Sequence, residues 1–379
     1  MKVGIDTFGC DHGRSGIGTY LMSLVRNLPE NKNNGNMDIE FELFGAEMDR
    51  FTFTGDKSFK FESVAVPESL VAERYWHTFK VNSFGKKHGY DAIVYSAGPR
   101  MLPRSFKVPG IAVVHDIVSN LFEQSDDFWF RRQMKKGLSH ADCIITPSQY
   151  IKKDLERSGI RCRKIEVIHN GIDHSLFYPR TDLGDGEEIV DIKPFAIKRP
   201  YIIYASRMQN EGKKHVELVK AFSMFKEKTG LPHRLVLAGS EGAYGEMVHK
   251  AIFDSSFSSD IFVTGYFPHE NFPELYRNAD ACVFPSVTEG VGLSVLEAMA
   301  CGIPVACSQA GAMGEMAGSN ALFFDSENLE EMSDAIEKIV CDSALRKKLS
   351  ADGLEWTKRF SWEKTAAATL ELLKNLSEK

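Results

Sequence analysis

The sequence predicts an α/β protein with two domains, each built on a doubly wound parallel sheet. Its 379 residues are many for one core, because domains usually hold roughly 100–200 residues. Short apolar runs ending in Gly, Ser or His alternate with longer segments of helical periodicity, which is typical of parallel βαβ units. This pattern occurs twice, once on each side of a polar segment, and therefore indicates two such domains.

Eleven apolar runs are expected to be strands buried on both faces of a sheet. The first half of the chain contains six of them, at Val3–Thr7, Phe41–Phe44, Ala92–Tyr95, Ile111–His115, Cys143–Thr146 and Ile165–Ile168. The second half contains the other five, at Tyr201–Ala205, Arg234–Ala238, Ile261–Thr264, Ala281–Phe284 and Pro304–Cys307. Helical patterns separate most of these runs, so each half is expected to form its own doubly wound sheet.

The segment Arg180–Lys198 is expected to link the domains, because it is rich in Gly, Asp and Glu and shows little periodicity. Near the end of the chain a helix is expected from Ser361, with Ala366, Leu370 and Leu373 on one apolar stripe. Two facing sheets would form a cleft between the domains. Open α/β sheets bind ligands beyond the carboxyl ends of their strands, so candidate site residues are those that directly follow strands.

Composition indicates an ordinary globular protein and excludes some partners. The chain is 43% hydrophobic and 26% charged, with a net charge of −6, so no nucleic-acid partner is expected. The seven cysteines include no C-x-x-C pair, which indicates a reduced compartment and no structural zinc. Residues 1–6 lack the features of a signal peptide and no apolar run approaches about 20 residues, so a cytoplasmic location with at most peripheral membrane contact is expected.

The most informative segment runs from Glu289 to Ala300, directly after the strand Ala281–Phe284. Glu289 falls in a loop, and Glu297 falls in the helix that follows. A carboxylate accepts two hydrogen bonds side by side and so suits the neighbouring hydroxyls of a sugar or a ribose. The alternative is a loop glutamate and a solvated helical glutamate without a binding role.

The residues between the two glutamates suit a diphosphate. Gly290 and Gly292 allow the chain to approach a ligand closely. The main-chain amides of Gly292, Leu293 and Ser294 lie near a predicted helix N-terminus, where hydrogen-bond donors and the helix dipole together attract anions.

The segment resembles the E-x7-E signature of the retaining glycosyltransferases of family 4, which have the GT-B fold of two facing Rossmann-like domains. Cys301-Gly302-Ile303-Pro304-Val305 resembles the family's small-Gly-x-Pro-Val continuation. The resemblance covers nearly the whole chain and is densest over residues 201–324. It implies transfer of a hexose, of the mannosyl or glucosyl type, from a nucleotide diphosphate sugar to a glycan or lipid-linked acceptor hydroxyl. It also implies retention of configuration, with neither a metal ion nor another cofactor.

The predicted domains are residues 1–185 on the acceptor side, residues 186–355 for the nucleotide sugar, and a C-terminal helix over residues 356–379. Phe360-Ser361-Trp362 resembles the family's closing motif, whose helix crosses back to the first domain. This resemblance implies that the last helix packs on the N-terminal domain.

Arg207 and Lys213 follow the strand Tyr201–Ala205, much as the family places an Arg and a Lys on the donor diphosphate. A bidentate Arg and a point-charge Lys would stabilise the charge that develops on the leaving diphosphate, which is the work of a metal ion elsewhere. The chain contains no Asp-x-Asp triplet, which supports a metal-free site. One extra residue separates Arg207 from Lys213 relative to the family, so whether Lys213 or Lys214 binds phosphate stays open, as does an ordinary solvated basic turn.

Two candidates lie in the first half. Gly16 belongs to a glycine-rich loop after the first strand, and the family's corresponding loop lies across the cleft from the donor phosphates; the alternative is a plain turn before a helix. His115 ends the strand Ile111–His115 and resembles the family's histidine that contacts the transferred sugar, although most lone histidines are structural. Asp116 is expected to cap a helix or orient that ring. The Asn170-Gly171 turn is interpreted as architectural.

Two further features bear on the donor base and the acceptor. Tyr266 follows the strand Ile261–Thr264 and would either stack on the nucleobase or pack in the core. Residues 128–140 form a predicted helix with a basic face and an apolar face, which suits an anionic membrane surface or simply solvent.

Two alternatives to transfer stay open. One is a nucleotide-sugar epimerase of similar architecture, which would act on the donor without an acceptor. The other is an inactive protein that binds the sugar nucleotide.

Overall fold

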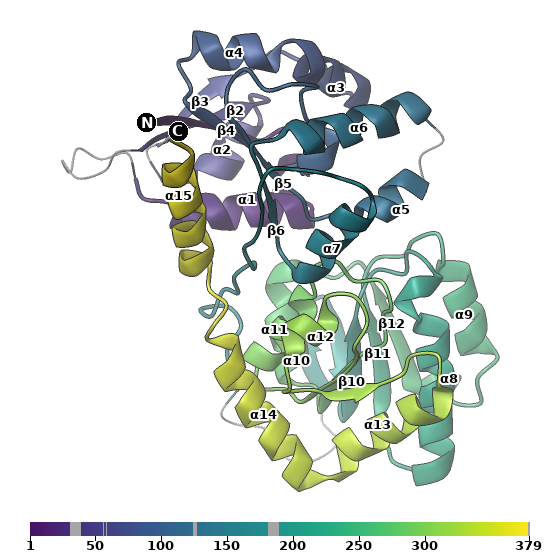
Figure 1. Cartoon of the computed structure of the whole chain (residues 1–379). Helices are drawn as coiled ribbons and strands as arrows, with labels where there is room; N and C mark the ends of the chain where they lie inside the picture. The colour runs from purple at the N-terminus through teal and green to yellow at the C-terminus, as the bar shows by residue number, and fades with distance from the viewer. Residues whose placement is uncertain (31–38, 56, 58, 124–126, 181–188, 378–379) are drawn as a thin grey trace. The chain divides into compact units, whose positions relative to one another are not determined.

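The computed structural model contains two compact units, and the chain passes from the first to the second and back again (Figure 1). Unit 1 comprises Met1–Gly171 and Phe360–Lys379, and unit 2 comprises Ile172–Arg359. The structure describes all residues except 31–38, 56, 58, 124–126, 181–188 and 378–379. The boundary predicted at 185/186 lies outside the described residues, whereas contacts assign residues 172–180 to unit 2. The reason is packing: Arg277 donates a hydrogen bond to the carbonyl oxygen of Leu176, for example.

Unit 1 contains a seven-stranded, all-parallel sheet with the order β3-β2-β1-β4-β5-β6-β7. The strand order reverses between β1 and β4, as in a doubly wound fold. The strands are β1 Lys2–Asp6, β2 Glu40–Gly45, β3 Lys60–Ser63, β4 Ala92–Tyr95, β5 Gly110–Val113, β6 Cys143–Thr146 and β7 Ile165–Val167. The helices are η1 Asp11–Gly13, α1 Gly16–Asn27, α2 Asp49–Thr54, α3 Leu70–Phe79, α4 Val81–Lys87, η2 Gly98–Arg100, α5 Val118–Glu123, α6 Phe128–His140, α7 Gln149–Arg157 and α15 Trp362–Ser377.

Helix α15 completes the core of unit 1, beside α1 in Figure 1. The predicted apolar stripe provides the contact, because Ala366 and Leu373 are buried and Leu370 packs against the same core. The Trp362 ring lies 5.8 Å from the Tyr20 ring of α1. The last helix therefore belongs to unit 1 although the preceding 188 residues, Ile172–Arg359, form unit 2.

Unit 2 contains a six-stranded parallel sheet with the order β12-β11-β10-β13-β14-β15. The order reverses between β10 and β13. The strands are β10 Tyr201–Ala205, β11 Arg234–Ala238, β12 Ile261–Gly265, β13 Ala281–Phe284, β14 Val305–Ser308 and β15 Leu322–Phe324. The helices are η3 Glu211–Lys213, α8 His215–Thr229, α9 Gly245–Phe253, η4 Ser258–Asp260, η5 His269–Asn271, α10 Phe272–Arg277, α11 Leu293–Ala300, α12 Met313–Ala317, α13 Leu329–Cys341 and α14 Ser343–Thr357.

The expected linker is shorter than predicted, because residues 189–198 form an antiparallel hairpin of β8, Ile189–Ile192, and β9, Phe195–Lys198. Its apolar side packs on unit 2: the Phe195 ring lies 5.5 Å from that of Phe262 and 6.1 Å from that of Phe267. The prediction of an irregular segment was wrong over residues 189–198. Each strand there has only four residues, which are too few for a half-buried pattern to be recognised as a strand. The edge strands β3 and β15 were also not predicted; both have only three or four residues.

Candidate active site

Most of the predicted donor residues of unit 2 follow β10 or β13, the two adjacent strands at which the sheet order of unit 2 reverses, whereas Tyr266 follows β12. Arg207 and Lys213 come after β10, and Glu289 comes after β13. In open α/β sheets this position lies beside the ligand crevice. The fold therefore brings these separate sequence segments to one edge of one sheet.

Lys213 and Glu289 form a direct ion pair, in which the Lys213 Nζ donates a hydrogen bond of 2.6 Å to Glu289 Oε2. Burial alone would lower the pKa of Lys213, but the negative charge of Glu289 and this hydrogen bond outweigh it, so the pKa is raised. Lys213 therefore stays cationic, and a ligand that reaches this pair meets both a positive and a negative group.

The turn carrying Lys213 is fastened to the loop carrying Glu289. The Tyr204 hydroxyl donates to the carbonyl oxygen of Lys213 at 2.8 Å and lies 2.7 Å from the Ser286 hydroxyl. A Cβ on Gly212 would lie only 2.4 Å from Thr288 Oγ1, so glycine permits the two loops to approach this closely. This packing holds the ion pair in place from both sides.

Lys214 lies in a different environment from Lys213. Its ammonium group pairs with Glu217 at 3.3 Å and with Glu327 at 2.7 Å, and its side chain is almost completely buried. Two carboxylates already satisfy its charge. The geometry thus favours Lys213 over Lys214 as the lysine available to a phosphate.

The backbone of Glu289 is held by a loop that the sequence did not single out. The Ala312 amide donates to the Glu289 carbonyl oxygen at 2.8 Å. Gly311 has a φ of +62°, and a Cβ there would lie 2.6 Å from the same oxygen. Only glycine fits this position, so Gly311 determines where Glu289 is placed.

Helix α11 begins at Leu293, after Gly292 with a φ of +74°. No described side chain caps its first turn, and that turn contains no acidic residue. Leu293 and Ser294 are partly exposed, and Gly290 lies in the loop just before them. The N-terminus of α11 thus offers amide donors and the positive end of the helix dipole, and no carboxylate in the first turn competes for them.

Glu297 lies one turn further along α11, and its Oε1 is 3.5 Å from His269 Nε2. Hydrogen bonding to Glu297 raises the pKa of His269, against the effect of burial. No sequence motif singles out His269, which lies four residues after the end of β12. Tyr266 is 76% exposed, so it does not pack in the core of unit 2.

Arg207 is exposed and makes no salt bridge within the part of the chain that the structure describes. The backbone beside Arg207 packs closely against Gly239, the residue that follows β11. A Cβ on Gly239 would lie 2.3 Å from the carbonyl oxygen of Ser206, so glycine is needed there. Of the predicted donor residues, the structure brings Lys213 and Glu289 into contact, whereas Arg207 contacts neither.

The two candidates of the first half, Gly16 and His115, belong to unit 1. Gly16 is the first residue of α1 and is exposed, and a Cβ there would meet no described atom within 4 Å. Packing instead requires glycine at Gly18, where a Cβ would lie 2.4 Å from the Cys10 carbonyl oxygen. Packing within unit 1 therefore does not explain a glycine at position 16.

His115 lies two residues beyond the end of β5, and its ring is 4.4 Å from the Tyr20 ring. Burial lowers its pKa to about 4, and Asn170 offsets only part of this effect. The ring is thus neutral at ordinary pH. Asp116 does not take either predicted role, because it forms a two-point salt bridge to Arg100 at 3.1 and 3.2 Å.

The sequence interpretation missed a buried ionic pair at the end of β1. Asp6 Oδ2 lies 2.7 Å from His77 Nε2, and both side chains are inaccessible to solvent. His77 Nδ1 lies 2.6 Å from the carbonyl oxygen of Glu73, which can only accept a hydrogen bond. The pair fastens α3 to β1, and no local pattern links residues so distant in sequence.

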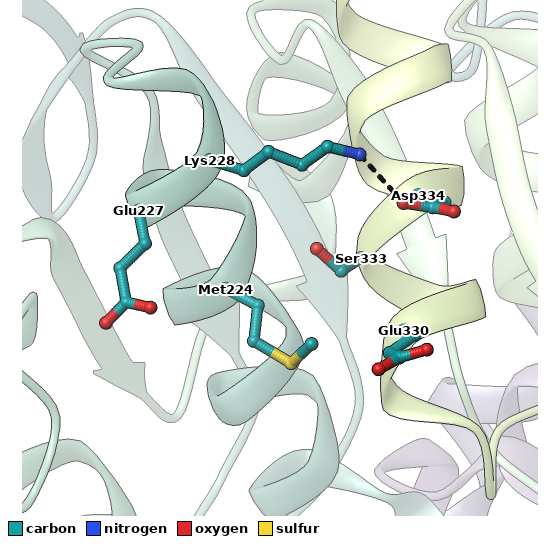
Figure 2. A pocket seen from close by; sticks show the side chains of 6 residues that line it. All are labelled: Met224, Glu227, Lys228, Glu330, Ser333 and Asp334. Carbon is teal, nitrogen blue, oxygen red and sulfur yellow. Dashed lines mark hydrogen bonds and ion pairs between the residues drawn. The ribbon is translucent and has the colours of Figure 1, made fainter.

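A cavity of about 480 Å³ lies elsewhere in unit 2, between α8 and α13 (Figure 2). Lys228 of α8 donates to Asp334 of α13 at 3.1 Å across it. The cavity is lined by none of the predicted site residues.

Among the residues that the structure describes, no group of three or more His, Cys, Asp or Glu side chains could hold a metal ion. Within the same residues, no helix has the length and apolar character needed to cross a membrane.

Two family models match the chain. "Glycosyltransferase Family 4" matches residues 14–176, and "Glycosyl transferases group 1" matches residues 185–356. The first match covers residues 14–171 of unit 1 and continues to residue 176 in unit 2, and the second lies wholly within unit 2. Strand β1 and helix α15 lie outside both matches.

Known proteins of similar sequence include O-antigen chain mannosyltransferase B of Escherichia coli, 32% identical over 46% of this chain and 46% of that protein. An uncharacterized glycosyltransferase of Methanocaldococcus jannaschii is 27% identical over 77% of this chain and 75% of the relative. A D-inositol 3-phosphate glycosyltransferase of Arthrobacter sp. is 28% identical over 55% and 49%. The matched stretch thus spans about half the length of the mannosyltransferase and of the inositol phosphate enzyme.

Solved structures share the fold at low identity. Sucrose-phosphate synthase from Thermosynechococcus elongatus superposes with a TM-score of 0.73 at 19% identity, over 99% of both chains. Anabaena HepE, in complex with UDP and glucose, has a TM-score of 0.71 at 18% identity, over 98% of this chain and 99% of HepE. Two Rossmann-like sheets and these neighbours define a GT-B glycosyltransferase fold. Within that class, the chain belongs to the family 4-like glycosyltransferases.

Proposed function

We propose that this protein transfers a hexose, of the mannosyl or glucosyl type, from a nucleotide diphosphate sugar to a hydroxyl of a glycan or lipid-linked acceptor. The observation that carries the proposal is the Lys213–Glu289 ion pair, which lies after the two strands where the sheet order of unit 2 reverses. Similar proteins support the same chemistry, since one is a mannosyltransferase and HepE was solved in complex with UDP and glucose.

In the proposed donor complex, the diphosphate competes with Glu289 for Lys213. Lys213 and Arg207 bind the phosphate oxygens, together with the amides of Gly292, Leu293 and Ser294 at the start of α11. The carboxylate of Glu289, released from Lys213, then accepts hydrogen bonds from the sugar hydroxyls. Arg207 is exposed, and no described residue forms a salt bridge with it, so its guanidinium group can turn toward the phosphates.

The remaining proposed contacts identify the two ends of the donor. Glu297 accepts hydrogen bonds from the ribose hydroxyls, and Tyr266 stacks on the nucleobase. His115 contacts the transferred sugar as a neutral ring, and Gly16 leaves room for the phosphates. Both of these residues belong to unit 1.

We further propose retention by front-face substitution without a metal ion or other cofactor. The bond from the anomeric carbon to the diphosphate oxygen breaks on the face where the acceptor oxygen bonds to that carbon. The acceptor's proton passes to the leaving phosphate oxygen. The cations and amides around the diphosphate stabilise its growing negative charge, as a metal ion does in other transferases.

Replacing Glu289 tests this proposal. A panel of nucleotide diphosphate sugars, screened by thermal shift, selects the donor, and mass spectrometry of the products identifies the transferred sugar. Glu289→Ala should then abolish transfer while leaving nucleotide diphosphate binding largely intact. Glu327→Ala is the matched control, because it removes a carboxylate from Lys214 and not from Lys213. Full transfer by Glu289→Ala would contradict the assignment.

Incubation of the donor without acceptor separates the alternatives. A transferase without an acceptor should at most hydrolyse the donor slowly. An epimerase would instead invert the configuration at one carbon of the sugar, which ¹H NMR of the sugar detects. Binding without either reaction, across an acceptor panel, would indicate an inactive binding protein.

We also propose that α6 brings the enzyme to the inner face of an anionic membrane, where a lipid-linked acceptor would reside. At its start Phe128 and Trp129 are 58% and 74% exposed. Its basic side chains Arg132, Lys135 and Lys136 are exposed as well, while Met134 and Leu138 pack inward. Vesicles with anionic lipid should co-sediment the protein, and neutral vesicles should not. Unchanged co-sedimentation after all four basic residues, Arg131 included, become Gln would contradict this contact.

A further inference from the structure

Glu297 is a mostly buried carboxylate with a single partner in the part of the chain that the structure describes. Its side chain is 15% exposed, and its Oε1 lies 3.5 Å from Nε2 of His269. No other described residue forms a hydrogen bond or an ion pair with this carboxylate. Its two oxygens offer about four lone-pair sites, so Oε2 is left to accept hydrogen bonds from a ligand.

The His269 ring is placed by aromatic neighbours and directed by Glu297. Its centroid lies 5.9 Å from that of Phe177 and 6.2 Å from that of Phe272. Because a carboxylate oxygen can only accept, Nε2 is the donor toward Glu297. The His269 side chain is 56% exposed, so the core of unit 2 does not require a histidine at this position.

The turn that carries His269 is fastened on both sides by the β8–β9 hairpin. Before it, Phe267 is buried, and its ring stacks 6.1 Å from that of Phe195 in β9. After it, Asn271 Nδ2 donates at 2.8 Å to the carbonyl oxygen of Lys193, which lies between β8 and β9. The hairpin therefore fixes the backbone from which the His269 ring reaches Glu297.

We propose that His269 is a positioning residue for Glu297: its Nε2–H holds Oε1, so that Oε2 is presented to the ribose hydroxyls of the donor. The inference rests on the proposed function, in which Glu297 binds the ribose. A glutamate that is held before the ligand arrives loses less side-chain entropy when the ligand binds. Tyr266, the proposed contact to the nucleobase, lies three residues before His269. One segment after β12 thus supplies the contact to the base and orients the carboxylate for the ribose.

The preference of the protein for ribose tests this inference. It is measured by calorimetry of the full chain, as the dissociation constant of a 2′,3′-dideoxynucleoside diphosphate divided by that of the nucleoside diphosphate. UDP or GDP serves as the probe, according to which one the thermal-shift screen selects. The wild type should prefer the ribose about 10- to 100-fold, the usual contribution of a hydrogen bond to a charged group. Glu297→Ala should abolish this preference.

Two variants of His269 separate its N–H group from its ring. His269→Phe keeps an aromatic ring beside Phe177 and Phe272 but has no N–H, and should lower the preference to less than about threefold. His269→Gln keeps an N–H but has no ring, and should retain most of the preference. Full preference in His269→Phe, or a greater loss in His269→Gln than in His269→Phe, would overturn the inference, because the ring would then act only by packing.

The same measurements distinguish the inference from the proposed function. If Glu297→Ala loses the preference and His269→Phe keeps it, the ribose contact of Glu297 stands and the role of His269 is wrong. If Glu297→Ala keeps the preference, the proposed ribose contact is wrong, and the inference fails with it.

NMR titration of the histidines tests the contact without any ligand. Glu297→Gln should lower the pKa of His269, because it removes the negative charge beside Nε2. Glu270→Gln is the matched control, and should lower this pKa less, since Glu297 raises it more than Glu270 does. An unchanged titration of His269 in Glu297→Gln would overturn the inference, even if a variant in the binding series did not fold.

Discussion

Gly311→Ala should damage the proposed active site although Gly311 is not one of the proposed donor-binding residues. Two costs follow from the structure. The φ of +62° costs an L-residue about 1–2 kcal/mol, and the new Cβ would lie 2.6 Å from the carbonyl oxygen and 2.8 Å from the amide nitrogen of Glu289. Relieving such a backbone clash typically costs a further ~1–3 kcal/mol. The Glu289 loop is the part that must shift.

Gly230→Ala isolates the first cost, so the difference between the two variants measures the second. Gly230 has nearly the same φ, +64°, but a Cβ there meets no described atom within 4 Å. It should therefore lose only the backbone term, about 1–2 kcal/mol, and keep full activity. Gly311→Ala should lose more stability than Gly230→Ala and about 100-fold in kcat/KM, since a displacement near 1 Å in an active site costs about that much.

The assay compares denaturant unfolding and donor kinetics for the two variants side by side. Nucleotide diphosphate binding should fall less than kcat, because α11 and its amides do not contain Gly311. Equal stability and equal kcat/KM in Gly311→Ala and Gly230→Ala would refute the view that Gly311 places Glu289.

Three further predictions follow from the site and from unit 1. Lys213→Met should lower kcat/KM for the donor about 100- to 1000-fold, whereas Lys214→Met should lower it less than tenfold; the reverse order would assign the phosphate to Lys214. Asp6→Asn should cost about 3–5 kcal/mol of unfolding free energy, since it leaves the buried His77 without a negatively charged partner. The pKa of His77 is raised: burial lowers it, but Asp6 outweighs burial. The wild type should therefore keep this stabilisation below about pH 6.5 and lose it as the pH rises through the folded pKa, and thermal unfolding against pH should show no such loss in Asp6→Asn. Finally, transfer should persist in excess EDTA, and abolition by EDTA with recovery on adding a divalent metal would exclude the metal-free proposal.

Much of the fold follows from local patterns. Runs such as Ala92–Tyr95, Cys143–Thr146 and Ala281–Phe284 have the predicted bounds, because a strand buried on both faces must be apolar throughout. The hairpin over residues 189–198 could not be found this way, since only one of its faces is covered and its strands have four residues each. Family membership was also within reach of the sequence, because the motif from Glu289 to Ala300 is continuous in the chain.

The sequence alone determined which residue types follow which strands, and so which side chains could meet at one edge of a sheet. Only the tertiary structure decided which of them do meet. Lys213 and Lys214 are adjacent in sequence, yet one pairs with Glu289 and the other with Glu217 and Glu327. Asp116 is bound by Arg100 rather than orienting His115, and Gly311 supports Glu289 from a separate loop. The physical reason is that hydrogen bonds and ion pairs depend on distances of a few ångströms between segments far apart in the chain, which local periodicity does not encode.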